Sequence, residues 1–390
     1  MRLVKLLLPG LLLVVIPNAS CGAPAPADQR ALSSTELDVI DRDTVGAVVV
    51  GPAQFPFDSA SDVTRLMTFD ANGNLLGSIT GGALLNAQVD GLDNRLVTAN
   101  ADQLISVSNT HKTATPIKKQ VVESSIQDEG RTRTATWFND GRQGSTTTTT
   151  YWSTEHTGQQ TTGTIQGMAL ASAFCGASIY ALVEDIDSLS WNKPTQNWLY
   201  RIETNGTRTE VATWEADPSV RPASRQAVCS ADGTSMTVLY ASRQGTPAGS
   251  LPTLQQWVFN LQDGSIDKRV LLEANDEWRI HANGVASSKE RLYWINSSGS
   301  VYSISSSSLL EPAKLEWKVP HTGPRTRLSI HGGRVQVLDY ANHPTLHEFE
   351  LASGRKTRES ISLPWLSPII DSPTASGQST NTVTDLLVQG

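Results

Sequence analysis

A chain of 390 residues with 38 acidic and 31 basic side chains carries a net charge of -7, and neither sign is gathered into a stripe. This excludes the clustered basic surface that compensates the phosphates of nucleic acid, so nucleic acid is not an expected partner. Charged residues make up only 18% of the chain, while Thr, Ser and Gly are abundant, which is typical of an all-β, turn-rich protein.

The first twenty residues have the pattern of a secretory signal peptide. Arg2 and Lys5 make the start positive, and an apolar run follows over residues 6–16. That run is too short to span a bilayer, which takes ~20 apolar residues, but it suits the apolar region of a signal peptide. We therefore expect residues 1–20 to direct export and the body of the protein to lie outside the cytoplasm.

Residues 18–22, Asn-Ala-Ser-Cys-Gly, resemble the processing site of bacterial lipoproteins, where the cysteine becomes the acylated first residue of the mature chain. The resemblance implies that Cys21 is a lipid anchor, with Asn18 in the place where that family has an aliphatic residue. The alternative is ordinary cleavage nearby, which removes Cys21 and releases a secreted protein. The Ala- and Pro-rich stretch that follows predicts a flexible tether over residues 21–44.

From residue 45 onward the chain repeats one unit, two runs of β-branched and aromatic residues joined by a Gly-containing turn. Asn-Gly, Asp-Gly and Ser-Gly turns supply the positive φ of tight hairpins, so each unit predicts a β-hairpin. Further strands precede several hairpins, and strand plus hairpin makes the antiparallel, four-stranded blade of a β-propeller. The clearest hairpins are 63–79, 198–214, 257–272, 292–304 and 346–361.

Counting these units along residues 45–365 predicts a seven-bladed β-propeller, with six and eight blades as alternatives. Their lengths suit a propeller repeat of roughly 40 to 50 residues with variable loops. The predicted blades are 45–82, 83–118, 119–170, 171–222, 223–280, 281–322 and 323–365. Residues 366–390 are expected to form a flexible tail, whose end, 384–388, is a candidate strand for closing the ring beside the first blade.

The turn Ser230-Ala231-Asp232-Gly233, followed by a strand, a loop and the hairpin 257–272, resembles the repeat of TolB-like propellers. That repeat carries a Ser-Pro-Asp-Gly turn, and here Ala231 replaces the proline. The predicted blade 223–280 matches this repeat closely, and the other blades share only its order of strands and turns. The resemblance therefore implies an architecture, that of extracytoplasmic TolB-like or quinoprotein-like propellers, and no particular activity.

Cys175 and Cys229 stand at equivalent places in consecutive predicted blades, each just before a strand. Equivalent positions of neighbouring blades lie close together around a propeller's centre, and a disulfide forms where Cα atoms are ~5.5 Å apart. We therefore expect a bridge between these two residues in an exported protein. The alternative is a pair of buried thiols.

The tryptophans are numerous, ten in all, and Trp198, Trp257 and Trp294 fall in corresponding strands of successive predicted units. Large rings there are expected to fill the space between blades. Trp152 and Trp278 are instead candidates for a ligand-binding face. Trp152 belongs to the Thr-rich residues 131–164, for which a projecting two-stranded flap and a low-complexity loop are the two interpretations.

Motifs for catalysis and metal binding are weak throughout. Ser190 and Lys193 match the Ser-x-x-Lys spacing of penicillin-recognising enzymes, but the companion motifs are absent from the sequence. His343 and His347 are separated by Pro344 and precede a strand, where residues four apart stand ~13 Å from each other. We therefore assign no catalytic residue and no metal ligand, and the cofactor, if any, stays unknown.

These observations favour an exported, monomeric propeller that reaches the membrane only through a lipid anchor. It would act as a binding or scaffold module of the cell envelope and hold a protein, glycan or peptide. The alternative is a propeller enzyme, such as a quinoprotein dehydrogenase, a lactonase or a glycan-active hydrolase, because propellers host these activities with residues from separate blades. A purely structural or surface-display role, carried by the Thr-rich segment and the tail, is a third interpretation.

Overall fold

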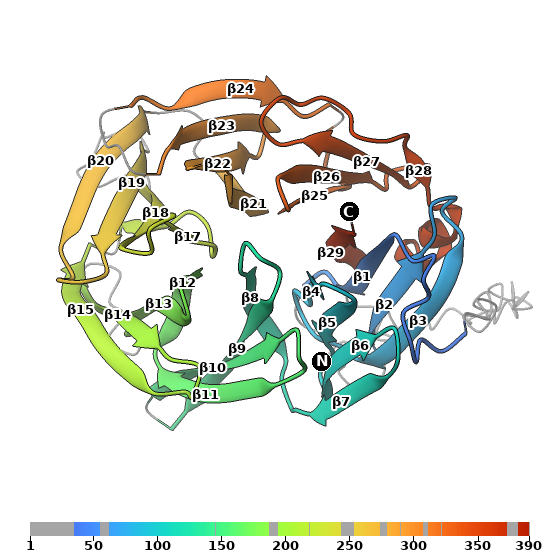
Figure 1. Cartoon of the computed structure of the whole chain (residues 1–390), viewed down its shortest axis with the longest axis horizontal. Helices are drawn as coiled ribbons and strands as arrows, with labels where there is room; N and C mark the ends of the chain where they lie inside the picture. The colour runs from blue at the N-terminus through green and yellow to red at the C-terminus, as the bar shows by residue number, and fades with distance from the viewer. Residues whose placement is uncertain are drawn as a thin grey trace, which may run out of the picture. The chain divides into compact units, whose positions relative to one another are not determined.

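The computed structural model describes residues 35–54, 62–144, 146–186, 194–217, 219–242, 253–273, 279–288, 290–306, 311–320, 322–372 and 381–389. These residues form seven antiparallel sheets arranged as the blades of a ring (Figure 1). The chain is a seven-bladed β-propeller, as its repeat pattern predicts. No helix in this part of the chain is long and apolar enough to cross a membrane.

The strands of each blade are numbered from the centre of the ring to the rim, so that the first strand is the innermost and the fourth the outermost (Figure 1). Blade 1 consists of β29 (Asn381–Val388), β1 (Gly46–Pro52), β2 (Val63–Phe69) and β3 (Leu75–Gly82). Blade 2 consists of β4 (Val89–Leu92), β5 (Arg95–Ala99), β6 (Gln103–Ser108) and β7 (Lys112–Pro116). Blade 3 consists of β8 (Val121–Gln127), β9 (Arg133–Gln143), β10 (Thr146–Glu155) and β11 (Gln160–Gln166).

The remaining blades follow in chain order, and in blade 5 the innermost strand is split into two short strands, β16 and β17. Blade 4 consists of β12 (Met168–Cys175), β13 (Ser178–Glu184), β14 (Thr195–Ile202) and β15 (Arg208–Ala216). Blade 5 consists of β16 (Val220–Pro222), β17 (Val228–Cys229), β18 (Ser235–Ser242), β19 (Thr253–Asn260) and β20 (Ile266–Glu273). Blade 6 consists of β21 (Ile280–Ser288), β22 (Arg291–Asn296), β23 (Ser300–Ser305) and β24 (Lys314–Lys318). Blade 7 consists of β25 (Thr326–His331), β26 (Arg334–Asp339), β27 (Thr345–Glu350) and β28 (Ile361–Ser362).

The C-terminal strand closes the ring. β29 pairs antiparallel with β1, from Gly46 opposite Val388 to Pro52 opposite Asn381. Residues 383–388 are all buried, and Leu387 packs in the hydrophobic cluster of blades 1 to 3. Blade 1 thus combines strands from the two ends of the described chain, and pairing with β29 covers the inner edge of β1.

Two segments flanking the expected propeller also belong to it. Residues 35–44, expected in the tether, pack on blades 1 and 2, where Leu37 and Ile40 are buried. After blade 7, a 3-10 turn and the short helix α1 (Ser367–Ile370) bury Ile369 and Ile370 among residues of blades 1 and 7. Both segments were expected to be flexible because of the Ala, Pro and Ser residues near them. Their buried apolar side chains instead pack them against the propeller.

Four of the five predicted hairpins are the third and fourth strands of a blade, but residues 292–304 are the second and third strands of blade 6. Trp294 therefore lies in a second strand, while Trp198 and Trp257 lie in third strands. The expected correspondence of the three tryptophans is wrong, because a hairpin turn does not encode which pair of strands in a blade it joins. Trp257 and Trp294 are nonetheless buried, as expected for rings that fill the space between blades.

The Thr-rich residues 131–164 are neither a projecting flap nor a loop. They supply β9 and β10, the second and third strands of blade 3, together with part of β11. Thr147, Thr149 and Tyr151 of β10 are buried. Thr is β-branched and packs inside a sheet as readily as it covers one, so a Thr run does not distinguish a blade from a flap.

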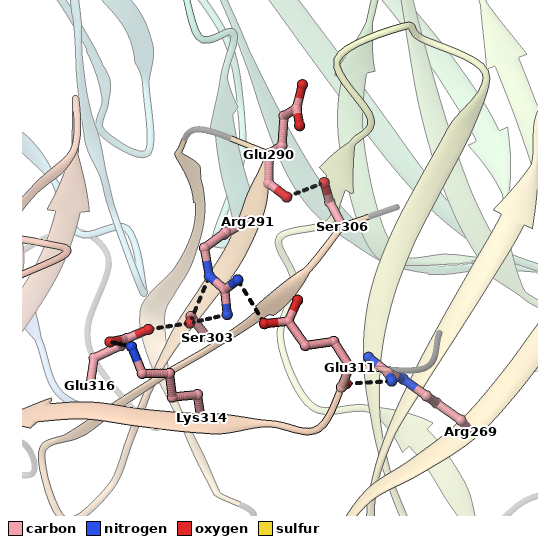
Figure 2. Close-up of polar contacts among 8 residues, drawn as sticks. All are labelled: Arg269, Glu290, Arg291, Ser303, Ser306, Glu311, Lys314 and Glu316. Atoms are coloured by element: carbon pink, nitrogen blue, oxygen red, sulfur yellow. Dashed lines mark hydrogen bonds and ion pairs between the residues drawn. The ribbon is translucent and has the colours of Figure 1, made fainter. Parts of the chain in front are cut away.

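Polar side chains link the outer parts of blades 5 and 6 (Figure 2). The carbonyl oxygen of Glu311 accepts a hydrogen bond from Nη1 of Arg269 in β20, and its carboxylate accepts one from Nη1 of Arg291 in β22 at 2.9 Å. Ser303 accepts hydrogen bonds from Arg291 and donates one to Glu316 at 2.6 Å. The Arg291–Glu311 pair lies within blade 6, and ion pairs as exposed as this one contribute only about 0–1 kcal/mol. The bond from Arg269 is the one in this network that links the two blades.

Candidate functional site

A cavity of about 410 Å³ lies at the centre of the ring, and we call it the central pocket. Its lining comes from the innermost strands of blades 2 to 7 and from the turns that follow most of those strands. The main lining segments are residues 125–131 of blade 3, 226–233 of blade 5, 285–287 of blade 6 and 330–332 of blade 7. A volume of this size suits a small ligand or the end of a larger one.

Near the centre of the ring, hydrogen bonds join blade 6 to blades 1 and 2 through Asn283, which precedes the lining residues 285–287 in β21. The pairing of β21 with β22 skips residues 281–284, which bulge out of the sheet. From this bulge the Nδ2 of Asn283 donates a hydrogen bond to Asp385 of β29 at 2.7 Å, and its Oδ1 accepts one from Gln88 at 3.1 Å. Because blade 7 lies between blades 6 and 1, these bonds tie together blades that are not all neighbours.

Asp90 of β4 lines the central pocket between blades 2 and 3. It is buried, and its Oδ2 accepts hydrogen bonds from the hydroxyl groups of Ser125 and Thr134. Burial raises the pKa of Asp90 to about 7, an effect opposed by the two hydroxyl donors and reinforced by the negative charge of Asp385. Near neutral pH the pocket therefore holds a carboxyl group that can gain or lose a proton.

Asp90→Asn is expected to remove part of the pH dependence of stability. The folded-state pKa of about 7 lies above the unfolded value of roughly 3.9, so the folded protein keeps a proton that the unfolded chain releases. The Asp90 contribution to the free energy of unfolding is thus fully present below about pH 4 and is lost as the pH rises through about 7. The urea midpoint of Asp90→Asn minus that of wild type should therefore be larger at about pH 8 than at about pH 5. An identical difference at both pH values would show that Asp90 does not titrate in this range.

Arg131 lies in the turn between β8 and β9 with φ of +54°, in the left-handed region that favours glycine. Its backbone N–H donates to the carbonyl of Asp128 at 3.0 Å. In the matching turn of blade 5, the N–H of Gly233 donates to the carbonyl of Ser230 at 2.9 Å, and φ of Gly233 is +70°. Blade 3 therefore has an arginine where blade 5 has a glycine, at a strain of about 1–2 kcal/mol for a residue with a Cβ.

The side chain of Arg131 lies beside the blade 7 turn at Gly332, and its Nε is buried with no hydrogen-bond partner among the described residues. Burial lowers the pKa of Arg131, as does the charge of Arg334, while Asp93 opposes them. His331 comes just before this turn. Burial and the charge of Arg131 lower the pKa of His331 to about 4, so its ring is neutral near pH 7.

The other charged side chains of the lining are engaged by neighbours. Hydroxyl or backbone N–H donors bind each carboxylate, and the guanidinium of Arg133 donates to backbone carbonyls. These contacts involve Asp128 with Thr132 and Arg133, Glu129 with Ser287, Asp232 with Ser230 and Thr234, and Arg133 with Gly176 and Ala177. Within the described part of the chain, Arg131 is the charged residue of the lining whose side chain makes no hydrogen bond or ion pair.

The predicted disulfide is confirmed. Cys175 and Cys229 are bonded with their Cα atoms 5.4 Å apart, and the bond joins the innermost strands of blades 4 and 5. Cys229 also lines the central pocket. The bridge therefore holds one wall of the pocket as well as the seam between two blades.

The two candidate aromatic residues are not gathered at the pocket. Trp152 lies in β10, partly buried against the hydrophobic cluster of blades 1 to 3. Trp278, like Cys21, lies outside the described residues. His347 is engaged with Ser360, and the described residues contain no group of three or more His, Cys, Asp or Glu side chains placed to hold a metal ion.

The sequence reasoning missed Asp90, Arg131 and His331. Asp90 and His331 carry no local signal, since each stands in an ordinary short strand. Arg131 does carry one, because aligning Asp-Glu-Gly-Arg-Thr with Ser-Ala-Asp-Gly-Thr of blade 5 places it on Gly233. An arginine at a position of positive φ is uncommon, although Asp93 and Glu290 also have positive φ in the matching turns of blades 2 and 6.

No protein-family model matches the sequence, and no curated protein matches it either. Solved structures resemble it in fold. A functionally unknown protein from Desulfotomaculum acetoxidans is 12% identical with a TM-score of 0.49 and covers 80% of this chain and 94% of its own. The likeness shows the fold alone.

Two further solved structures are similar at lower TM-scores. An apocarotenoid oxygenase from Synechocystis is 10% identical with a TM-score of 0.46, over 83% of this chain and 90% of its own. BamB from Moraxella catarrhalis is 11% identical with a TM-score of 0.38, over 70% of this chain and 74% of its own. Because one fold hosts many unrelated functions, the function has to be argued from the site.

Proposed function

We propose that this protein is an exported, membrane-tethered binding module of the cell envelope that holds its ligand in the central pocket. The observation that carries the proposal is the pocket itself, a cavity of about 410 Å³ built by six blades and containing an arginine without a bonded partner. Export and the tether at Cys21 rest on the pattern of residues 1–22. The ligand is a protein, glycan or peptide with a group small enough to enter.

The architecture suits recognition because the lining is held from several directions. The innermost strands of a propeller are each paired within a blade, the disulfide clamps two of them, and the Asn283 hydrogen bonds tie blade 6 to blades 1 and 2. Turns on such a rigid frame keep their shape before a ligand arrives, which lowers the entropy lost on binding.

Ala231→Trp is expected to block the central pocket and abolish ligand binding. Ala231 is exposed in the turn that precedes β18, and it lines the pocket, so an indole ring at this position takes up space at the mouth without disturbing the core. Gln262→Trp is the matched control, because Gln262 is exposed in the turn between β19 and β20 of the same blade.

The three full-length forms should be tagged, cross-linked in cells and analysed by mass spectrometry for bound molecules and for the mature N-terminus. A ligand recovered with wild type and Gln262→Trp but lost from Ala231→Trp supports the pocket as the binding site. Equal recovery from all three, or no ligand from any, contradicts it. An acylated Cys21 supports the tether, and a mature chain that begins after Cys21 contradicts it.

Asp90 favours one second candidate, an enzyme that uses this carboxyl group as a general acid or base. A side chain with a pKa of about 7 inside a cavity is suited to proton transfer near neutral pH. Of the enzyme classes considered from the sequence, hydrolysis of a lactone or a glycan would use such a group. Turnover of a lactone or oligosaccharide panel that is lost in Asp90→Asn would favour this candidate over simple binding.

A further inference from the structure

Arg131, the charged residue of the central pocket without a bonded partner among the described residues, has a strained backbone conformation. Arg131 occupies the left-handed position that Gly233 occupies in blade 5, where any residue with a Cβ is less stable than glycine. Nothing in the turn itself requires an arginine, since the hydrogen bonds of the turn come from its backbone and from Asp128. Residues kept at such positions against local preference are concentrated at binding sites.

The surroundings of Arg131 favour an anion. Arg334 of blade 7 adds positive charge nearby and already pairs with Glu348 at 2.9 Å, while His331 is neutral near pH 7. Asp93 of blade 2 is the acidic group that opposes this field, and no ion pair joins it to Arg131 within the described residues. A ligand anion could therefore take the free donors of the guanidinium, whose Nε is buried without a partner.

The pocket suits a singly charged group better than a phosphate. Asp90, Asp128, Glu129 and Asp232 also line it, and these carboxylates repel a dianion more strongly than a monoanion. The second arginine of the lining, Arg133, is already bonded to Asp128 and to backbone carbonyls. A single guanidinium matches a carboxylate, with which it forms two parallel hydrogen bonds. One free guanidinium therefore favours an anion with a single negative charge.

Another part of the lining is ready to accept a hydrogen bond. The side-chain oxygen of Gln226, in blade 5, is buried and has no hydrogen-bond partner among the described residues. Between the polar groups lie apolar side chains, among them Ile126, Phe174 and Ile330. The lining therefore combines a cation, an acceptor and an apolar wall, which is the complement of a carboxylate, an N–H donor and an apolar substituent.

We infer that the central pocket recognises a carboxylate that neighbours an amide N–H, with Arg131 pairing with the carboxylate and Gln226 accepting the N–H. Two sources offer this chemistry, the C-terminal end of a peptide and an N-acylated amino acid. Capture of a C-terminal carboxylate by backbone N–H groups is a general mode of peptide recognition, and an arginine pairs with a carboxylate through two parallel hydrogen bonds. This inference rests on the proposed function of the pocket as a binding site.

Arg131→Gly separates the role of the side chain from the stability of the fold. Glycine fits a φ of +54° without strain, so the variant is expected to melt no lower than wild type. Its binding of free-acid probes is expected to fall by about tenfold or more, since a hydrogen bond to a charged group is lost. Arg131→Lys keeps the charge and should retain part of the affinity. Arg355→Gln removes an exposed arginine at a turn of blade 7 and should bind like wild type.

The probes are a tripeptide library with free C-terminal carboxylates, the same library with C-terminal amides, and a set of N-acetyl amino acids, each tested on the full chain by native mass spectrometry. We expect the free acids to bind and the amides to bind about tenfold more weakly or not at all. Binding of tripeptides alone assigns the peptide source, binding of N-acetyl amino acids alone assigns the other, and binding of both limits recognition to the terminal residue.

Equal binding of acids and amides, equal binding by wild type and Arg131→Gly, or no binding of any probe would overturn the inference. The proposed function fails separately. If Ala231→Trp loses a ligand recovered from cells while no probe binds, the pocket remains the binding site and only the carboxylate assignment is wrong. If Ala231→Trp changes nothing in cells, the pocket itself is not the site.

Discussion

Removal of residues 381–390 is expected to open the ring and prevent the chain from reaching its native fold. β29 is the innermost strand of blade 1, and without it β1 exposes the backbone groups that now pair with residues 381–388. Buried apolar side chains would be lost at the same time from the clusters on both faces of the blade, Leu387 from one and Leu386 from the other. Losing even one such leucine from a core costs about 2–5 kcal/mol, which is a large part of a typical domain's stability.

Circular dichroism and urea unfolding of the truncated chain test this expectation, with binding of a hydrophobic dye as a measure of exposed core. We expect a broad transition, strong dye binding and aggregation through the exposed edge of β1. A synthetic peptide of residues 381–390 added to the truncated chain should restore a cooperative transition, and a scrambled peptide should not. A truncated chain that unfolds as cooperatively as wild type would show that six complete blades and an open one suffice.

Loss of the Cys175–Cys229 bridge is expected to lower the free energy of unfolding by ~2 to 4 kcal/mol. The bond closes a loop with a sequence separation of 54 residues, so it restricts the unfolded chain substantially. It also joins two innermost strands whose packing with their neighbours is retained when the bond is broken. The folded ring is therefore expected to persist with lower stability.

Melting temperatures with and without reductant measure this effect, and the double variant Cys175→Ala, Cys229→Ala is the control. Reductant should lower the melting temperature of wild type and leave that of the double variant unchanged. Equal melting temperatures of wild type in both conditions would refute a stabilising bridge. Because Cys229 lines the central pocket, ligand binding measured in the same two conditions would show whether the bridge also holds the shape of the site.

Much of the fold was predictable because its determinants are local. A Gly-containing turn between two β-branched runs specifies a hairpin within about twenty residues, and the repetition of that unit indicates a propeller. The predicted blade 171–222 compares with observed strands from Met168 to Ala216, and 323–365 compares with strands from Thr326 to Ser362. The two cysteines were predictable for the same reason, since equivalent places in adjacent repeats lie side by side.

The predictions were wrong where one local sequence pattern is compatible with different strands of a blade. Trp294 stands before a Gly turn like Trp198 and Trp257, yet its strand is the second of its blade and theirs the third. The Thr-rich strands of blade 3 have the composition of an exposed ribbon, but Thr147, Thr149 and Thr150 are buried in the folded blade.

By itself, the sequence determined the all-β propeller class, and it favoured seven blades and the Cys175–Cys229 bridge over their alternatives, because each depends on neighbouring residues or on a regular repeat. Tertiary structure alone decided the central pocket. Asp90, Arg131, Gln226 and His331 come from blades 2, 3, 5 and 7, and closure of the ring brings them to one cavity. The pKa of Asp90 and the lack of a bonded partner for Arg131 depend on burial and on neighbouring groups from other blades, which are properties of the folded chain.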